Sequence, residues 1–432
     1  MSSEWRSYRL EEVGRIVTGK TPKSGVSTFE GTDVPFISPL DFSGDKWINR
    51  SVRAISEVGA QAVKGCIIPA RSVLVTCIGS DMGKAAIAAS RSVTNQQINA
   101  IVVDEGRFCP EFIYYNLSLR KAEIRSMAGG SAQPILNKSA FSRLFFECPS
   151  LNEQHRIVEA LRPLDDRIAL LRETNATLEA IAQALFKSWF VDFDPVRARM
   201  EGRAPEGMDD ATAALFPDSF EESKLGWVPQ GWRLAPLSDA FEINPTRKLK
   251  KGELAPYLDM ASVGTQGHSV SGTVQREMGS GTKFINGDTL LARITPCLEN
   301  GKTAFVDGLP EGQTGWGSTE FVVLRPKTPL PVYYAYLLCR HTAFRDFAIQ
   351  SMSGTSGRQR IQNDVLGRYP VVVPSTDVAE AFGQVVGSIQ QKIAANHVQA
   401  QTLATLRDTL LPRLISGQLR RPDAEAMAPE TA

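Results

Sequence analysis

The sequence has few of the features that mark metal-binding, disulfide-stabilised or membrane proteins. Its six cysteines never form a Cys-x-x-Cys pair, so we expect reduced thiols and neither a zinc site nor a disulfide framework. The four histidines are equally scattered, and we expect no metal site. There is no run of about 18 apolar residues, so no transmembrane helix is expected. The N-terminus lacks an apolar signal core, which favours a cytoplasmic location.

Catalytic motifs are incomplete as well. Residues 301–303 (Gly-Lys-Thr) end like a phosphate-binding loop, but Pro296 stands where the first glycine of that loop is required. Asn244-Pro245 is followed by threonine, whereas an amino-methyltransferase motif needs a second proline and an aromatic residue. The acidic segment 217–224 only echoes a nuclease motif, because its spacing is too short. We therefore expect no catalytic residues in this chain.

The net charge of +1 does not by itself indicate a nucleic-acid partner, but the charge is unevenly distributed. Residues 192–224 hold nine acidic and four basic side chains, so this segment carries −5 and the remainder +6. A basic binding face elsewhere in the chain is therefore possible on charge grounds.

The chain repeats itself. Trp5-Arg6 returns as Trp232-Arg233, and the segment beginning at Met127 returns at Met352, at offsets of 227 and 225 residues. Gly83-Lys84, Ile135-Leu-Asn137 and Pro149 also return in the same order, as Gly301-Lys302, Ile361-Gln-Asn363 and Pro374. So many ordered matches indicate a tandem duplication.

Each copy ends in a long segment with heptad spacing, which predicts two long helices that pack on each other. Pro163 is expected to kink or restart the first helix. Asn175 and Asn396 are the polar seam positions and are predicted to fix the register. The seam positions of the first helix are Ile157, Leu161, Leu164, Ile168, Leu171, Asn175, Leu178, Ala182, Leu185 and Trp189. Those of the second are Phe382, Val386, Ile389, Ile393, Asn396, Ala400, Leu403, Arg407, Leu410 and Leu414.

The predicted fold class is α+β, with two small mixed domains whose cores are rich in β-strands. Each is expected to contain one amphipathic helix, over 111–125 and 332–349. Because the repeat favours a symmetric solution, the helices are predicted to form an antiparallel coiled coil that separates the domains about a pseudo-twofold axis. The predicted divisions are 1–150 (first recognition domain), 151–192 (first helix), 193–224 (acidic linker), 225–375 (second recognition domain), 376–418 (second helix) and 419–432 (flexible tail).

Both domains have loops rich in glycine and in the side chains that contact duplex DNA. Lysine and arginine neutralise phosphates, whereas arginine, asparagine and glutamine also pair with base edges in the major groove. The loop from Gly354 to Arg360 is the strongest single candidate, because it holds two arginines and a glutamine. The first-domain candidates are Lys20, Thr21, Lys23, Gly83, Lys84, Asn95, Gln96, Gln97, Gly130, Ser131 and Gln133. The second-domain candidates are Arg247, Lys248, Arg293, Lys302, Thr355, Ser356, Arg358, Gln359 and Arg360.

Three segments, 129–137 (GGSAQPILN), 148–157 (CPSLNEQHRI) and 185–195 (LFKSWFVDFDP), closely resemble the specificity subunit of type I restriction–modification enzymes. The resemblance extends over nearly the whole chain. It implies that each domain reads one half of a bipartite, asymmetric DNA target and that the helix pair sets the length of the spacer. In the second domain Gly-Arg-Gln-Arg at 357–360 replaces the Ala-Gln-Pro of the family pattern, so its base contacts cannot be copied from the first.

The same resemblance implies partners that supply the chemistry. Two modification subunits would dock on the helices and methylate DNA with S-adenosylmethionine, and restriction subunits would use ATP and Mg²⁺. No cofactor is expected in this chain.

Two other interpretations stay open from the residues alone. One is a fused or solitary methyltransferase or nuclease, which activity of the purified chain with S-adenosylmethionine or Mg²⁺ would reveal. The other is a coiled-coil scaffold that binds proteins and needs no basic loops. Neutralising Arg358 and Arg360 would leave its behaviour toward DNA unchanged.

Overall fold

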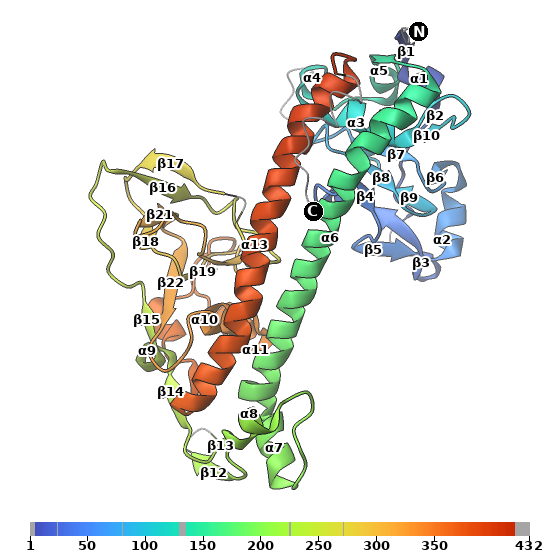
Figure 1. The fold of residues 1–432 in the computed structure, drawn as a ribbon. Helices are drawn as coiled ribbons and strands as arrows, with labels where there is room; N and C mark the ends of the chain where they lie inside the picture. Colours follow the sequence, from blue (N-terminus) through green and yellow to red (C-terminus); the bar gives the residue numbers. More distant parts are fainter. Residues whose placement is uncertain are drawn as a thin grey trace. The chain divides into compact units, whose positions relative to one another are not determined.

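The computed structural model describes residues 5–23, 25–79, 81–128, 135–223, 226–270 and 272–419. The chain divides into two compact units. Unit 1 comprises residues 1–169 and 401–432, and unit 2 comprises residues 170–400. The division falls inside two long helices, α6 (Leu151–Lys187) and α13 (Thr376–Ile415), each of which therefore contributes one part to each unit (Figure 1).

Unit 1 is built on a sheet with the strand order β2-β10-β7-β8-β4. The run Val-Leu-Val-Thr of β7 is buried on both faces, because a second sheet and helix α3 (Pro110–Ser118) enclose it. The second sheet has the order β5-β3-β9-β6, and β1 (Arg6–Arg9) pairs with β11 (Phe145–Cys148). The strands of the first sheet are β2 (Gly14–Thr18), β10 (Ile98–Val103), β7 (Val73–Thr76), β8 (Ala85–Ala88) and β4 (Trp47–Ile48). Those of the second are β5 (Arg53–Ile55), β3 (Glu30–Ile37), β9 (Ser92–Thr94) and β6 (Ile67–Ile68).

Unit 2 repeats this topology, except that its described residues include no counterpart of β4. The sheet β15-β22-β19-β20 corresponds to β2-β10-β7-β8, and β17-β16-β21-β18 corresponds to β5-β3-β9-β6, including one parallel pair in each second sheet. β14 (Arg233–Pro236) pairs with β23 (Pro370–Val373), as β1 pairs with β11. The duplication predicted from sequence is therefore present in the fold. The strands of the first sheet are β15 (Phe241–Ile243), β22 (Phe321–Pro326), β19 (Thr289–Ala292) and β20 (Thr303–Phe305). Those of the second are β17 (Val274–Glu277), β16 (Leu254–Leu258), β21 (Gly315–Gly317) and β18 (Thr282–Phe284).

The short helices depart from prediction. The expected helix over 111–125 is divided into α3 and α4 (Lys121–Ser126), and the one over 332–349 into α10 (Tyr334–Arg340) and α11 (Thr342–Gln350). His341 has an extended backbone (φ −69°, ψ 135°), which ends the first helix and starts the second. Propensity over one segment cannot reveal such a break, because the packing of both halves decides it. Further short helices of the two repeats are α1 (Leu10–Val13), α2 (Glu57–Ala62), α5 (Lys138–Ser142), α9 (Leu237–Ala240) and α12 (Asn363–Leu366).

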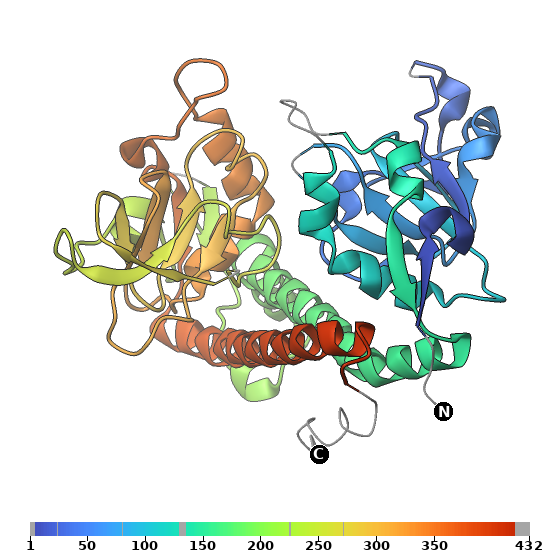
Figure 2. The ribbon, with the colours of Figure 1, turned by 90° about the horizontal axis from the view of Figure 1, so that it is seen from above.

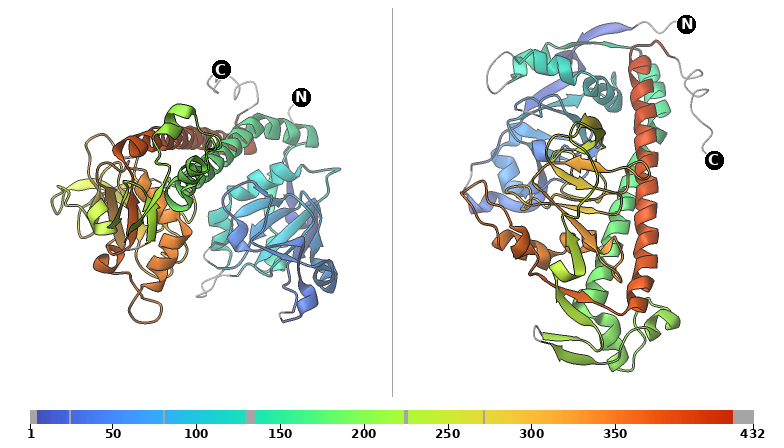
Figure 3. Two further views of the ribbon diagram at one scale, coloured as in Figure 1. Left: turned by 90° about the horizontal axis from the view of Figure 1, so that it is seen from below. Right: turned by 90° about the vertical axis from the view of Figure 1, so that its left-hand side faces the viewer.

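The helices α6 and α13 run antiparallel in each unit (Figure 3). In unit 1, Leu161 and its neighbours pack in one core with Leu410 and Leu414. In unit 2, Trp189 lies against Phe382, with ring centroids 5.4 Å apart, whereas Asn175 meets Asn396. Trp189 lies in the π-helical turn Ser188–Asp192 that continues α6. Later residues of this continuous helix thus meet earlier residues of α13, as the symmetric interpretation of the repeat requires.

Pro163 lies inside α6 and does not restart it. Proline removes one backbone hydrogen bond from a helix, which destabilises an isolated helix. The buried contacts of the neighbouring residues Leu161 and Ile168 offset that loss here. Of the two outcomes expected at this proline, a kink or a new helix, the new helix was therefore wrong.

The segment 193–224, expected to be an acidic linker, is folded over most of its described length. It forms α7 (Asp194–Met200), α8 (Asp210–Ala214) and β12 (Phe220–Ser223), and β12 pairs with β13 (Gly226–Pro229). Val196 and Phe216 are buried in the main core of unit 2. Val196 and Phe216 could not be recognised as core residues in this acidic sequence, because only tertiary packing brings them together.

Candidate nucleic-acid interface

In unit 1 the candidate loops of the first domain gather at one end of the first sheet. Neighbouring strands there are antiparallel, with Thr18 opposite Asn99, Ile98 opposite Thr76 and Val75 opposite Ala85. The segments that follow β2 and β7 and those that precede β10 and β8 therefore emerge at the same edge. We call this edge the loop end of unit 1. Loops held by a rigid sheet are a common location for binding residues.

Hydrogen bonds join these loops to one another. Lys20 donates its backbone N–H to the carbonyl of Thr94 (2.9 Å), and the Thr21 hydroxyl donates to Oε1 of Gln96 (2.8 Å). Lys20, Lys23 and Gln96 are exposed. The loop end of unit 1 thus presents two cations and one amide from two strand connections.

Other first-domain candidates have structural roles in these loops. The Asn95 side chain is buried and donates to Oε1 of Gln97 (2.9 Å), which shapes the turn before β10. Gly83 is buried at a φ of 88°, where a Cβ would lie 2.9 Å from Lys121, so the turn before β8 requires glycine. Lys84 is half-buried and pairs with Asp81 (3.0 Å). Gly130, Ser131 and Gln133 lie outside the described residues.

Unit 2 has the equivalent edge, the loop end of unit 2. Ala292 of β19 lies opposite Phe321 of β22, and Leu291 opposite Thr303 of β20. The backbone bond from Ala292 to the carbonyl of Lys302 (3.0 Å) repeats that from Thr76 to Lys84 (3.0 Å). Lys302 and its turn are therefore placed as Lys84 is in unit 1.

Residues 353–360 form a hairpin beside this edge. Ser353 and Arg360 exchange two backbone hydrogen bonds, of 3.0 and 2.9 Å. Between them, Thr355, Ser356 and Arg358 are exposed. The segment between α11 and α12 projects as a loop, coloured orange in Figure 2. The candidate loop with two arginines is thus an ordered hairpin tip in the structure.

Several second-domain cations are already engaged. Arg247 donates to the fully buried carboxylate of Asp288 (2.9 Å), which also accepts from Arg325 (2.8 Å). The Lys302 ammonium donates to the carbonyl of Met260 (2.6 Å). These contacts hold loops together, because a buried carboxylate needs partners of opposite charge. Lys248 is exposed.

Arg360 forms a two-pronged ion pair with Glu320, with Nη2 2.7 Å from Oε1 and Nε 2.8 Å from Oε2. These hydrogen bonds lower the pKa of the Glu320 carboxyl below its usual value. Both residues keep part of their surface, with side-chain exposures of 39% and 24%. Glu320 immediately precedes β22 and was missed from sequence, because nothing in its neighbourhood marks a carboxylate that will face an arginine 40 residues away.

Gln362 was missed as well. Its side-chain Oε1 accepts from Nη2 of Arg293 (3.2 Å), and the glutamine is exposed beside that candidate arginine. The backbone bond from Ile361 to Arg293 (3.0 Å) repeats that from Leu136 to Cys77 (2.9 Å). The structure therefore aligns Gln362 with Asn137, one residue away from the alignment that the sequence suggested.

Asn137 and Gln362, which occupy equivalent backbone positions, make different side-chain contacts. Asn137 caps helix α5 by accepting from the N–H of Ala140 (2.9 Å). Gln362 precedes α12 without a side-chain cap and holds Arg293 instead. The loop ends thus share a backbone frame and differ in the side chains that they present.

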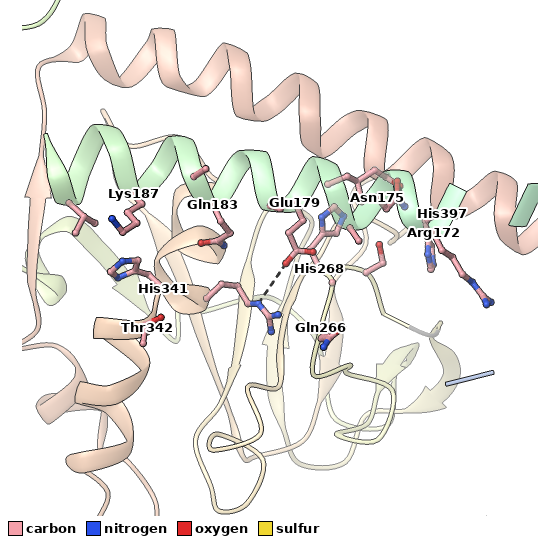
Figure 4. Close-up of a pocket in the computed structure, with 18 of the residues that line it drawn as sticks. Arg172, Asn175, Glu179, Gln183, Lys187, Gln266, His268, His341, Thr342 and His397 are labelled. Carbon is pink, nitrogen blue, oxygen red and sulfur yellow. Dashed lines mark hydrogen bonds and ion pairs between the residues drawn. The ribbon is translucent and has the colours of Figure 1, made fainter. Parts of the chain in front are cut away.

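A pocket of about 1180 Å³ lies elsewhere in unit 2, along α6 (Figure 4). Glu179 on its wall pairs with Arg340 (3.6 Å) and accepts a hydrogen bond from the hydroxyl of Tyr336. Near it, His268 is fully buried between Tyr333 (2.9 Å) and Asp307 (3.1 Å). The Glu179 contacts attach the second domain to α6, whereas the His268 contacts lie within the domain, and both sets lie outside the loop end.

The described residues include no group of three His, Cys, Asp or Glu side chains that could hold a metal ion. In the same part of the chain, no helix is both long and apolar enough to cross a membrane.

Comparison with known proteins finds a matching family model and similar proteins. Residues 2–180 match the model of the type I restriction modification DNA specificity domain. The type I restriction enzyme MjaIX specificity subunit of Methanocaldococcus jannaschii is 26% identical over 96% of this chain and 94% of its own length. The HindI specificity subunit of Haemophilus influenzae is 23% identical over 96% of this chain and 100% of its own length.

A solved structure has a similar fold. The S subunit of the type I restriction-modification system from M. genitalium superposes with a TM-score of 0.51 at 16% identity, covering 96% of each chain. Residues 2–180 are thus a type I restriction modification DNA specificity domain, and over 96% of its length the chain is similar to type I restriction enzyme specificity subunits.

Proposed function

We propose that this chain is the DNA sequence-specificity subunit of a type I restriction–modification complex and that it performs no catalytic step itself. The observation that carries the proposal is the pair of equivalent loop ends. Each is the same edge of the same sheet, and each presents exposed cations and amides, with Lys20 and Gln96 in unit 1 and Arg358 and Gln362 in unit 2. Such side chains bind phosphates and read base edges.

Each loop end would read one half of a bipartite target. Matched backbone positions in the two loop ends place side chains in equivalent locations. Different side chains at these positions would select different bases. The two copies differ at matched positions, with Cys77 where unit 2 has Arg293 and Asn137 where unit 2 has Gln362. An asymmetric target follows from this difference.

The coiled coil would set the spacer between the half-sites and provide the docking surface for two modification subunits. S-adenosylmethionine would then be bound by those subunits, and ATP and Mg²⁺ by restriction subunits. The complex would act in the cytoplasm. The specificity-subunit names of the full-length relatives support this assignment.

The test is to express the full chain with its modification subunits and to map the methylated bases in the host DNA by sequencing. We expect one bipartite, asymmetric motif. Replacing residues 1–150 by the corresponding segment of a relative should change one half of the motif only. Methylation without a motif, or a change in both halves, would contradict the proposal.

Deleting one heptad from each helix in register tests the spacer, and the deletions should shorten it. An unchanged spacer would show that the helices do not set its length.

A further inference from the structure

The hairpin 353–360 is fixed at its base from two sides. Its first and last residues exchange backbone hydrogen bonds, and Gln359 is tied to the loop after β19. The Gln359 carbonyl accepts from the N–H of Thr295 (3.0 Å), and its own N–H donates to the Thr295 hydroxyl (3.0 Å). The hairpin therefore moves as one body with the loop end of unit 2.

The two arginines of this hairpin have different surroundings. The Arg360 guanidinium donates hydrogen bonds from Nε and Nη2 to the carboxylate of Glu320. These two donors, the planar fork of the side chain, are therefore not available to a base or a phosphate. Arg358 is exposed, and its guanidinium makes no hydrogen bond or ion pair with any residue that the structure describes. Only its backbone is used, with its N–H bonded to Thr355 (2.9 Å) at the turn.

We propose that Arg358 reads a base of the second half-site and that Glu320 and Arg360 are positioning residues that hold its hairpin. This inference rests on the proposed function. It divides two arginines that the sequence places together as equal candidates. Of them, only Arg358 combines an unoccupied fork with a backbone held on a rigid base.

The chemistry of the fork points to guanine. Arginine contacts guanine through two parallel hydrogen bonds to O6 and N7, the commonest specific contact in the major groove. Lysine carries the same charge but lacks the planar fork, so it replaces arginine at a phosphate better than at a guanine. The substitution Arg358→Lys therefore separates reading of a base from attraction to the backbone.

The experiment uses the full chain in its complex with the modification subunits, and duplex DNA with the second half-site randomised. Bound duplexes are sequenced, and affinity is measured against salt for the selected duplex and for an unrelated one. We expect Arg358→Lys to lower the preference at one base pair by about ten-fold or more. Binding to the unrelated duplex and its salt dependence should stay unchanged, because the charge is kept.

Lys251→Arg is the matched control, since this lysine is also exposed in unit 2 and is not among the DNA-contact candidates. It should leave the selected motif unchanged. If Arg358→Lys also leaves the motif unchanged, Arg358 does not read a base. If Arg358→Ala weakens binding to both duplexes equally and Arg358→Lys restores it, Arg358 is a phosphate contact and the inference is overturned.

The positioning role is tested with Glu320→Gln, Arg360→Gln and the double variant. If the pair acts only on the hairpin, each single change broadens the preference at the base pair that Arg358 reads, and the double change costs no more than either one. If Arg360 contacts a phosphate, Arg360→Gln lowers the salt slope by about 1 and Glu320→Gln strengthens binding. A lower salt slope in Arg360→Gln together with stronger binding in Glu320→Gln would overturn the division of roles between Arg358 and Arg360.

The outcome for the wild-type complex keeps the two proposals apart. A complex that selects no second half-site contradicts the proposed function. A complex that selects one, and whose motif is indifferent to Arg358, contradicts only this inference.

Discussion

The side chain of Asn396 donates a hydrogen bond to that of Asn175, with Nδ2 2.8 Å from Oδ1, where α13 crosses α6 in unit 2. Asn175 in turn donates to the backbone carbonyl of Ile393 (3.1 Å). Asn396 is 3% exposed, so its amide has few other partners within reach. A buried amide pair costs stability compared with leucine and specifies one register, because any shift leaves both amides unpaired.

We expect Asn396→Ala to lower the free energy of unfolding by about 1–3 kcal/mol, since it leaves the Asn175 oxygen without its donor. Replacing both asparagines by leucine should recover stability and loosen the register. Urea denaturation measures the first effect, and disulfide trapping between cysteines placed on the two helices measures the second. Asn300→Ala, at an exposed loop position, is the control and should change neither.

Gly19 lies where an added side chain would collide with the turn before β10. A Cβ there would lie 2.1 Å from the carbonyl oxygen of Asn95 and 2.3 Å from that of Thr94. Gly19→Ala must therefore push the loop of Lys20 away from the turn before β10. We expect reduced thermal stability and loss of recognition of one half-site, with the other half-site retained.

Gly65→Ala is the control for this change, because a Cβ at Gly65 meets nothing within 4 Å. Selection of bound duplexes from a pool with both half-sites randomised reads out the result. Equal loss of both half-sites in Gly19→Ala would show that the loop acts on the whole protein instead of on its own loop end.

Asp165 of α6 is the buried centre of a polar cluster in unit 1. Its carboxylate pairs with Lys46 (2.9 Å) and Arg407 (3.1 Å) and accepts a hydrogen bond from the Tyr115 hydroxyl. The Lys46 side chain is only 8% exposed. Asp165→Asn leaves this ammonium with no anion, and we expect a loss of about 3 kcal/mol in the free energy of unfolding.

The neighbouring Asp166 is exposed, and Asp166→Asn should have no such effect. Unfolding is monitored by near-ultraviolet circular dichroism, which follows the environment of the aromatic side chains. A loss of less than about 0.5 kcal/mol in the free energy of unfolding of Asp165→Asn would show that water can solvate the Lys46 ammonium in place of the carboxylate.

The Cys77 thiol makes stability depend on alkaline pH. Burial raises its pKa from 9.0 to about 11, although Asn99 donates a hydrogen bond to the sulfur. The folded state therefore holds this proton more tightly than the unfolded chain does. The stabilisation is complete below pH 9 and is lost as the pH rises toward 11, at no more than about 1.4 kcal/mol per pH unit.

Urea midpoints measured between pH 8 and pH 10.5 should fall less steeply in Cys77→Val than in the wild type. Valine keeps a similar volume and removes the titration. Alkylation by iodoacetamide gives an independent reading, because Cys77 should react slowly at pH 8 in the folded chain and rapidly in urea. Equal pH slopes in the two proteins would show that this thiol does not contribute.

The sequence predicts the parts of the fold that follow a period or a repeat. The seams that contain Leu161 and Leu414 are evenly spaced, so the two long helices follow from them, whereas their antiparallel pairing follows from the repeat. The roles of loop residues do not, because they depend on contacts far along the chain. Asn95 and Arg247 look like DNA contacts in sequence, and the structure uses both for internal hydrogen bonds.

Gln362 and Glu320 illustrate the opposite error. Neither lies in a basic loop, and each gains its place at the loop end of unit 2 only through an arginine from another segment, Arg293 and Arg360. The folded segment around Phe216 was missed for a related reason. A single aromatic residue in an acidic stretch carries no periodic signal, and its ring contact with Trp189 forms only in the folded chain.

The backbone bonds shared by Cys77 with Leu136 and by Arg293 with Ile361 have a consequence for redesign. Each unit shows, at matched positions, a second set of side chains that the same frame accommodates. Transplanting Arg293 together with Gln362 onto positions 77 and 137 would therefore move a supported arginine as a pair. Either transplant would put a charge where the first unit buries a thiol, and moving the arginine alone would also leave its partner behind.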